Sequence, residues 1–154
     1  MKKIIVLAFL AIPLVFSSCD DEVKTMVIDS SLPQGDFMVE ANGQFMSQNG
    51  TPTSGSVELG KDSEDDFFIR LSDNFMTELG TGTVSLYLST TNEDLNEVFN
   101  PSSGNPDVKL VGIVQRNGEH FFKINSAVDS KYSYVILWCA SAGIPFGNAE
   151  LTQN

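Results

Sequence analysis

Apolar and polar residues alternate with a period of two in three segments of the chain after Phe37. This period places successive side chains on opposite faces of a β-strand, whereas a helical stripe repeats every 3.6 residues. The apolar positions are Val57 and Leu59, then Phe67, Ile69 and Leu71, and then Val84, Leu86 and Leu88. The pattern predicts three strands, each with one buried and one exposed face.

Two further strand-like runs cover residues 108–115 and 120–124, and a short polar connection joins them. The connection contains Asn117 and Gly118, a pair that readily adopts the positive φ angles of a tight turn. We therefore expect the two runs to pair with each other as a β-hairpin.

The segment 132–139 is apolar on both faces of an extended chain. One face would carry Tyr132, Tyr134, Ile136 and Trp138, and the other Val135, Leu137 and Cys139. A strand that is apolar on both faces is typical of the centre of a sheet, so we expect both tyrosines to be core residues and Trp138 to anchor the core.

Helical periodicity is weak throughout, and only residues 93–99 favour a short helical turn before Pro101. Many short strands separated by Gly, Asn, Asp and Ser are typical of antiparallel β-architectures. We predict a single all-β domain, an antiparallel β-sandwich or a partly open β-barrel.

The N-terminus has the pattern of a signal peptide. Lys2 and Lys3 precede the apolar run 4–16, which is shorter than the roughly 20 residues of a membrane-spanning helix. Ser17 and Ser18 then precede Cys19, an order that resembles a lipobox. We expect a signal peptide at 1–18 and acylation of Cys19, for example with palmitate; the alternative is an ordinary secretory peptide that leaves this cysteine free.

Three acids, Asp20, Asp21 and Glu22, follow Cys19 without a gap. They resemble a surface-export signal of bacterial outer-membrane lipoproteins, although in other lineages an acid at this point retains the protein at the inner membrane. We expect a lipid-anchored protein of the outer membrane, at the cell surface or on the periplasmic face. The lipidated cysteine and an acidic tether with one early strand at 26–28 would occupy 19–36, and the β-domain 37–154.

The formal net charge of the 154-residue chain is −11, and removal of Lys2 and Lys3 would make it more negative. A polyanion repels nucleic acid phosphates, so we expect no nucleic acid partner. The acyl chains on Cys19 would instead bind the lipid bilayer.

The most specific motif is a strand that ends in Trp138 and Cys139, followed closely by a Phe-Gly segment. Its residues are Val135 to Cys139, then Pro145, Phe146, Gly147, Ala149 and Leu151; weaker matches upstream are Gly43, Phe45, Ser54, Gly55, Val57, Leu59, Phe68 to Leu71, Phe75, Tyr87 to Ser89, Leu110, Gly112, Val114 and Gly118. On these residues 42–151 resemble the DM13 domain, an extracytoplasmic β-domain family with a proposed role in electron transfer. The chain lacks the Pro and Asp of the family's Gly-Pro-Asp segment at 80–83.

The resemblance implies a compact β-sandwich and makes Cys139 the candidate redox thiol. Once Cys19 is acylated, no second cysteine can pair with Cys139, because the chain contains two. An unpaired thiol can react, pair with a partner protein, or bind a metal or haem; buried among apolar neighbours it is inert. The sequence identifies no cofactor site, and haem enters only through the family's association with redox domains.

Other candidate sites are weaker. His120, the only histidine, is interpreted as an exposed surface residue, with metal binding as the alternative. Asp62, Glu64, Asp65 and Asp66 could supply oxygen ligands to calcium but lack the glycine and spacing of a defined loop, so we interpret them as a solvated turn. We predict no metal site and no hydrolase chemistry.

Two functions follow. The first is an envelope lipoprotein whose DM13-like domain acts in electron transfer through Cys139, with a redox protein as partner and at most an accessory role in catalysis. The alternative is a non-catalytic binding or structural module in which Cys139 is inert. A sugar-binding surface built on Tyr132 and Tyr134 is a third and weaker option.

Overall fold

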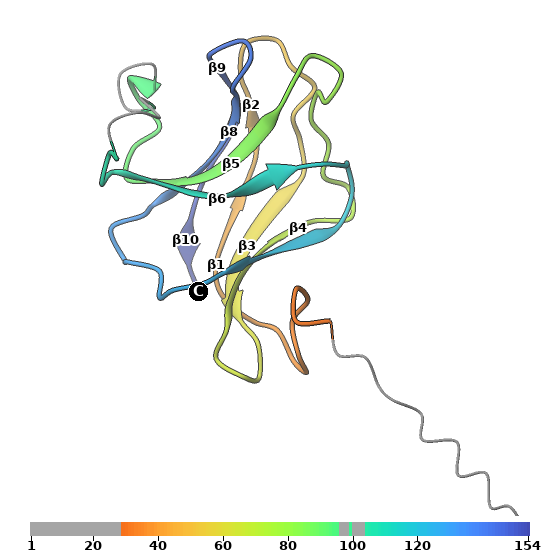
Figure 1. Cartoon of the computed structure of the whole chain (residues 1–154), viewed down its shortest axis with the longest axis vertical. Coiled ribbons are helices and arrows are strands. Elements are labelled where there is room, and N and C mark those ends of the chain that lie inside the picture. The colour runs from red at the N-terminus through yellow and green to blue at the C-terminus, as the bar shows by residue number, and fades with distance from the viewer. Residues whose placement is uncertain (1–28, 96–98, 100–103) are drawn as a thin grey trace, which may run out of the picture.

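The computed structural model of the chain describes residues 29–95, residue 99 and residues 104–154 (Figure 1). These residues form two five-stranded antiparallel sheets that face each other, and among them Leu95 alone has a helical assignment. The predicted all-β sandwich is confirmed, and the sheets do not close into a barrel. No helix in this part of the chain is long and apolar enough to cross a membrane.

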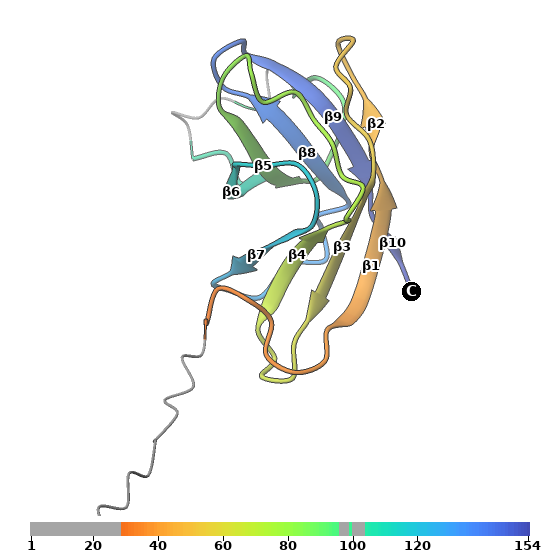
Figure 2. The same cartoon turned by 90° about the vertical axis from the view of Figure 1, so that its right-hand side faces the viewer.

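Ten strands make up the two sheets (Figures 1 and 2). The first sheet has the order β10 (Thr152–Gln153), β1 (Met38–Gln44), β3 (Ser56–Lys61), β4 (Phe67–Leu71) and β7 (His120–Ile124). The second sheet has the order β2 (Met46–Ser47), β9 (Ile144–Glu150), β8 (Tyr134–Cys139), β5 (Val84–Ser89) and β6 (Val108–Val114).

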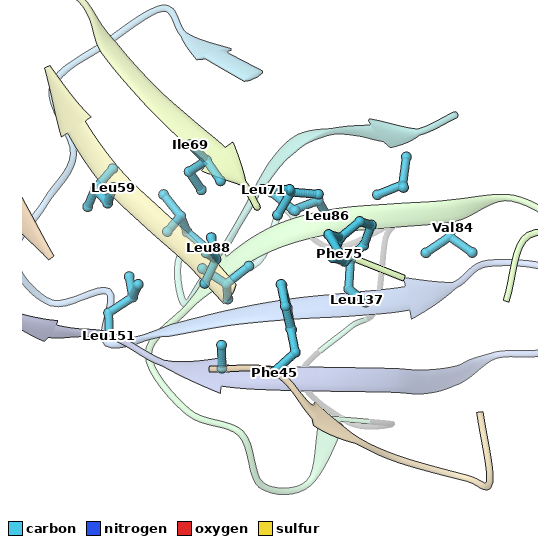
Figure 3. Packing of buried hydrophobic residues seen from close by; sticks show 14 of the residues in the cluster. Phe45, Leu59, Ile69, Leu71, Phe75, Val84, Leu86, Leu88, Leu137 and Leu151 are labelled. Carbon is cyan, nitrogen blue, oxygen red and sulfur yellow. The ribbon is translucent and has the colours of Figure 1, made fainter. Parts of the chain in front are cut away.

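The main hydrophobic core fills the space between the sheets (Figure 3). The alternating residues predicted to face inward do so in β3, β4 and β5. Val57, Leu59, Ile69, Leu71, Val84, Leu86 and Leu88 all belong to this core, and Phe67 packs against it. The period-two pattern therefore identified the strands and their inner faces correctly.

Strand β5 differs from its prediction, because both of its faces are buried. Ser85 and Ser89 on the outer face are 6% and 0% exposed. A second apolar cluster on this outer face contains Trp138, whose ring stacks on Phe99 at a centroid separation of 4.8 Å. The prediction that Trp138 anchors a core is confirmed. The helical turn predicted over 93–99 agrees with the residues of it that are described, because Leu95 is helical and the Phe99 amide donates to the Leu95 carbonyl at 2.8 Å; residues 96–98 lie outside the described residues.

The predicted hairpin between 108–115 and 120–124 is wrong. Both runs are strands, but β6 pairs with β5 in the second sheet and β7 pairs with β4 in the first. The turn residues bond elsewhere: the Gly118 amide donates to the Phe75 carbonyl, and the Asn117 side chain accepts from the Thr77 amide. Only Gly118 of the Asn-Gly pair has a positive φ, whereas a tight two-residue turn of type I′ needs two.

The two long sides of the sandwich differ. On one side the chain passes from β1 in the first sheet directly through Phe45 into β2 in the second. On the other side β6 and β7 are edge strands of different sheets, and Figure 2 shows them diverging. The sandwich is therefore connected along one side and open along the other.

Candidate functional site

Cys139 lies at the end of the central strand β8, opposite Val84 of β5 and Ile144 of β9. Its side chain belongs to the core between the sheets, and the residue is 0% exposed. It is a free cysteine, and Cys19 lies outside the described residues. The candidate redox thiol is thus enclosed among apolar side chains and is not reachable from solvent in this conformation.

A thin layer of backbone covers the sulfur at the rim of the sandwich. A Cβ atom added to Gly82 would lie 3.7 Å from Cys139 Sγ and 2.5 Å from Ser141 Oγ. Gly82 has a φ of 146° and is exposed, so glycine is needed there both for its conformation and for the close approach. We call residues 80–83 the lid. The Ala140 amide donates to the Thr83 carbonyl and so attaches the lid to the end of β8. The segment that lacks the family's Pro and Asp is therefore the one that approaches the sulfur, through Gly82.

His120 is half-buried, so its interpretation as an exposed surface residue is wrong. Its Nδ1 donates to the carbonyl oxygen of Gly118 at 2.9 Å, and its ring lies between Phe75 and Phe122. Burial lowers the pKa of His120 below its usual value, and the charge of Arg116 adds to this shift, while the bond to Gly118 opposes it. Its Nε2 is enclosed and has no hydrogen-bond partner among the described residues.

The described residues do not fit a haem. An axial ligand must face a pocket that admits the macrocycle, but Cys139 is fully buried and the Nε2 of His120 is enclosed. The two residues also belong to different sheets. In the part of the chain that the structure describes, no three His, Cys, Asp or Glu side chains are grouped to hold a metal ion.

The acidic run 62–66 forms the turn between β3 and β4, but Asp62 is 1% exposed and is not solvated. Its carboxylate accepts the backbone amides of Gln34, Glu64 and Asp66 at 2.9 to 3.0 Å. The bond from Gln34 contributes most to lowering the pKa of Asp62, against the opposing effect of burial. Asp62 therefore attaches the segment before β1 to the domain.

The two candidate sugar-binding tyrosines are half-buried and do not share a face. Tyr132 precedes β8 and packs against the core between the sheets, whereas Tyr134 packs against the outer cluster around Trp138. Expecting them on one face of a strand was wrong, because the strand begins at Tyr134. Tyr132 also donates to the Pro106 carbonyl, which leaves no open aromatic platform here.

One feature that sequence reasoning missed is an apolar groove of about 770 Å³ on the open side of the sandwich. Leu110 and Ile113 of β6 stand on its rim and are 56% and 50% exposed. Its lining residues are Ser31, Leu110, Val111, Gly112, Ile113, Gln115, Arg116, His120, Phe121 and Phe122. The groove exists because β6 and β7 belong to different sheets. The incorrect prediction that they pair as a hairpin left no place for it.

The fold and the enclosed thiol define a β-sandwich domain with one cysteine in its described core. The family model described as "Electron transfer DM13" matches residues 44–151. The chain belongs to the DM13 family, and this membership suggests a redox-related role. No curated protein and no solved structure matches the chain.

Proposed function

We propose that this protein is an envelope-anchored lipoprotein whose DM13 domain acts in a redox process through Cys139 as a sheltered thiol. The observation that carries the proposal is the position of the sulfur at the rim, beneath Gly82 and within the core. Family membership supports the redox role. The acyl anchor at Cys19 is inferred from sequence alone.

A sheltered thiol reacts only after local opening. Movement of 80–83 away from Ser141 breaks the hydrogen bond from the Ala140 amide to the Thr83 carbonyl. Strand β8 itself is paired with β5 on one side and with β9 on the other. Once exposed, the Cys139 thiol loses its proton to solvent and attacks a disulfide of a partner protein. One partner sulfur joins Cys139 in a mixed disulfide, and the other leaves as a thiolate.

The second candidate is a non-catalytic module in which Cys139 only fills the core. Its complete burial favours this function, because buried cysteines behave as small apolar residues. The two candidates predict different routes to the sulfur. A sheltered thiol is reached by local opening, and a packing residue only by global unfolding.

The experiment measures labelling of Cys139 by a thiol reagent in a chain that begins at Asp20, at rising but non-denaturing urea concentrations. This chain lacks Cys19, so Cys139 is its one thiol, and it retains all ten strands of the two sheets. Labelling that is nearly independent of urea indicates local opening and supports the proposal. If Cys139 is labelled only as fast as global unfolding allows, and the rate rises with urea as steeply as global unfolding does, the proposal is refuted. The inert module is then the better reading.

Gly82→Ala sharpens the test, because the new Cβ meets Ser141 at 2.5 Å and destabilises the lid. We expect labelling at least ten times faster than in the parent. Gly104→Ala is the matched control, since Gly104 also has a positive φ but has no atom within 4 Å of its added Cβ. Equal rates for both variants would contradict the role of 80–83 as the lid.

The anchor is tested separately in the full-length chain. Incorporation of labelled palmitate that is lost in Cys19→Ser, with release of the protein from the membrane fraction, supports lipidation. Protease treatment of intact cells then distinguishes the cell surface from the periplasmic face. Membrane association that persists in Cys19→Ser would refute the lipid anchor without affecting the proposal for Cys139.

A further inference from the structure

The chain contains three asparagines that are followed directly by glycine, at 42–43, 49–50 and 117–118. In such a pair the asparagine side chain readily loses its amide, because glycine has no side chain to keep its backbone nitrogen away from the asparagine Cγ. All three asparagines are exposed, so exposure alone does not distinguish them. Their hydrogen bonds and their backbone conformations do.

The pair at 117–118 is held by the loop that follows β4. The Asn117 Oδ1 accepts the Thr77 amide, and its Nδ2 donates to the Thr77 carbonyl. The Gly118 amide, which would be the attacking group, donates to the Phe75 carbonyl at 2.8 Å. Attack within this pair therefore requires that all three hydrogen bonds be broken.

The pair at 42–43 lies inside strand β1. Asn42 pairs with Glu58 of β3 on one side and with Thr152 of β10 on the other. A Cβ added to Gly43 would collide with the Glu150 carbonyl, so the backbone has no room here. Neither residue of this pair can rotate without disrupting the first sheet.

The pair at 49–50 forms an exposed turn after β2, at one end of the sandwich (Figure 2). Asn49 and Gly50 have φ angles of 53° and 72°, and the Thr51 amide donates to the Gln48 carbonyl, as in a type I′ turn. The Gly50 amide donates to no acceptor among the described residues, and no atom lies within 4 Å of a Cβ added to Gly50. The Asn49 side chain makes one hydrogen bond, from Nδ2 to the Pro145 carbonyl at 2.7 Å. The attacking nitrogen is thus free, and its surroundings are open.

We propose that Asn49 is a site of spontaneous deamidation, selected by the fold from the three Asn-Gly pairs. The backbone nitrogen of Gly50 bonds to Cγ of Asn49, and Nδ2 leaves as ammonia with the proton of the Gly50 amide. The cyclic imide that forms is then opened by water, which gives aspartate or isoaspartate at position 49. Water is the only co-reactant, and the inference depends neither on lipidation nor on Cys139.

The modification changes the contact between this turn and β9. The amide that donates to the Pro145 carbonyl is replaced by a carboxylate, which repels that carbonyl. The turn then remains attached through the Gln48 amide and the Thr51 hydroxyl, which both bond to the Phe146 carbonyl. We expect the modified turn to separate more readily from the start of β9.

The test keeps the full-length protein in mildly alkaline buffer, in its native state and in denaturing urea. Samples are digested at acidic pH, which stops the reaction, and the three Asn-Gly peptides are compared by mass spectrometry. In the native protein we expect position 49 to convert about ten times faster than positions 42 and 117, because fewer hydrogen bonds must be broken there. In urea the three positions should convert at similar rates. Equal rates in the native protein, faster conversion at 42 or 117, or conversion at 49 only in urea would overturn the proposal.

Two variants test the chemistry and its consequence. Gly50→Ala should slow conversion at 49 both in the native protein and in urea, whereas Gly104→Ala, at another open position with positive φ, should not. A rate at 49 that is unchanged by Gly50→Ala would contradict attack by the Gly50 nitrogen. Asn49→Asp reproduces the new charge and should accelerate hydrogen exchange of the Gln48 amide while the amides of β8 stay protected. Unchanged exchange at Gln48 would refute the release of the turn.

Discussion

Replacing Cys139 with serine and with alanine measures how apolar the surroundings of the sulfur are. Serine has nearly the same shape as cysteine but brings a hydroxyl into a site that is 0% exposed and lies among core residues. A buried hydroxyl without a partner costs about 1–3 kcal/mol. Alanine removes one heavy atom, which costs about 1 kcal/mol in lost burial with a small additional cavity cost. We therefore expect Cys139→Ser to be less stable than Cys139→Ala by about 1 kcal/mol.

The assay is equilibrium urea unfolding of the chain that begins at Asp20, followed by tryptophan fluorescence of Trp138, the only tryptophan. A parallel melting curve should show a decrease of roughly 3–5 °C for each kcal/mol in a domain of this size. The slopes of free energy against urea should match among the three proteins, so that midpoints report stability. A serine variant as stable as the parent would refute the reasoning, because it would mean that the sulfur lies in a polar or hydrated site.

Three further perturbations address the open side and the N-terminal segment. Gly112→Ala places a Cβ at 2.5 Å from the Phe122 ring and should cost about 1–3 kcal/mol in urea unfolding, with partial rescue by Phe122→Leu; no rescue would contradict this contact. The pKa of His120 is lower in the folded than in the unfolded protein, so the unfolded state takes up a proton first and stability is lost as the pH falls below about 6.5, the unfolded value. His120→Gln should remove this part of the pH dependence. The measurement is the urea midpoint of both proteins between pH 7.5 and 5.5. Asp62→Asn weakens the acceptor of the Gln34 amide and should accelerate hydrogen exchange at 34–36 without affecting β8, and unchanged exchange would show that this attachment is not needed.

Alternation along the chain predicted the strands because each sheet buries one face against the other. The pattern could not show that the outer face of β5 is buried as well, since the apolar cluster on that face includes Phe99 from the connection between β5 and β6. The Asn117-Gly118 pair was misleading for a similar reason. Its hydrogen-bonding groups are used by the loop around Phe75 and Thr77, and local turn propensity contains no information about such partners.

The candidate site was predictable in identity but not in environment. The Trp138-Cys139 motif led to the family, which the match over 44–151 confirms. Alternation with Val135 and Leu137 already favoured a core position for Cys139, whereas its thin cover depends on the conformation of Gly82. The groove was not predictable, because it arises where two strands adjacent in sequence enter different sheets.

The pairing of the first strand with the last has a consequence for the order of synthesis. Ala41 and Asn42 of β1 pair with Gln153 and Thr152 of β10, and Met46 and Ser47 of β2 pair with Asn148 and Gly147 of β9. Neither sheet can be completed until the ribosome has released almost the whole chain. Contacts of such long sequence separation also make folding slow. The domain therefore completes its fold only when synthesis is nearly finished, because both ends of the chain belong to the same sheets.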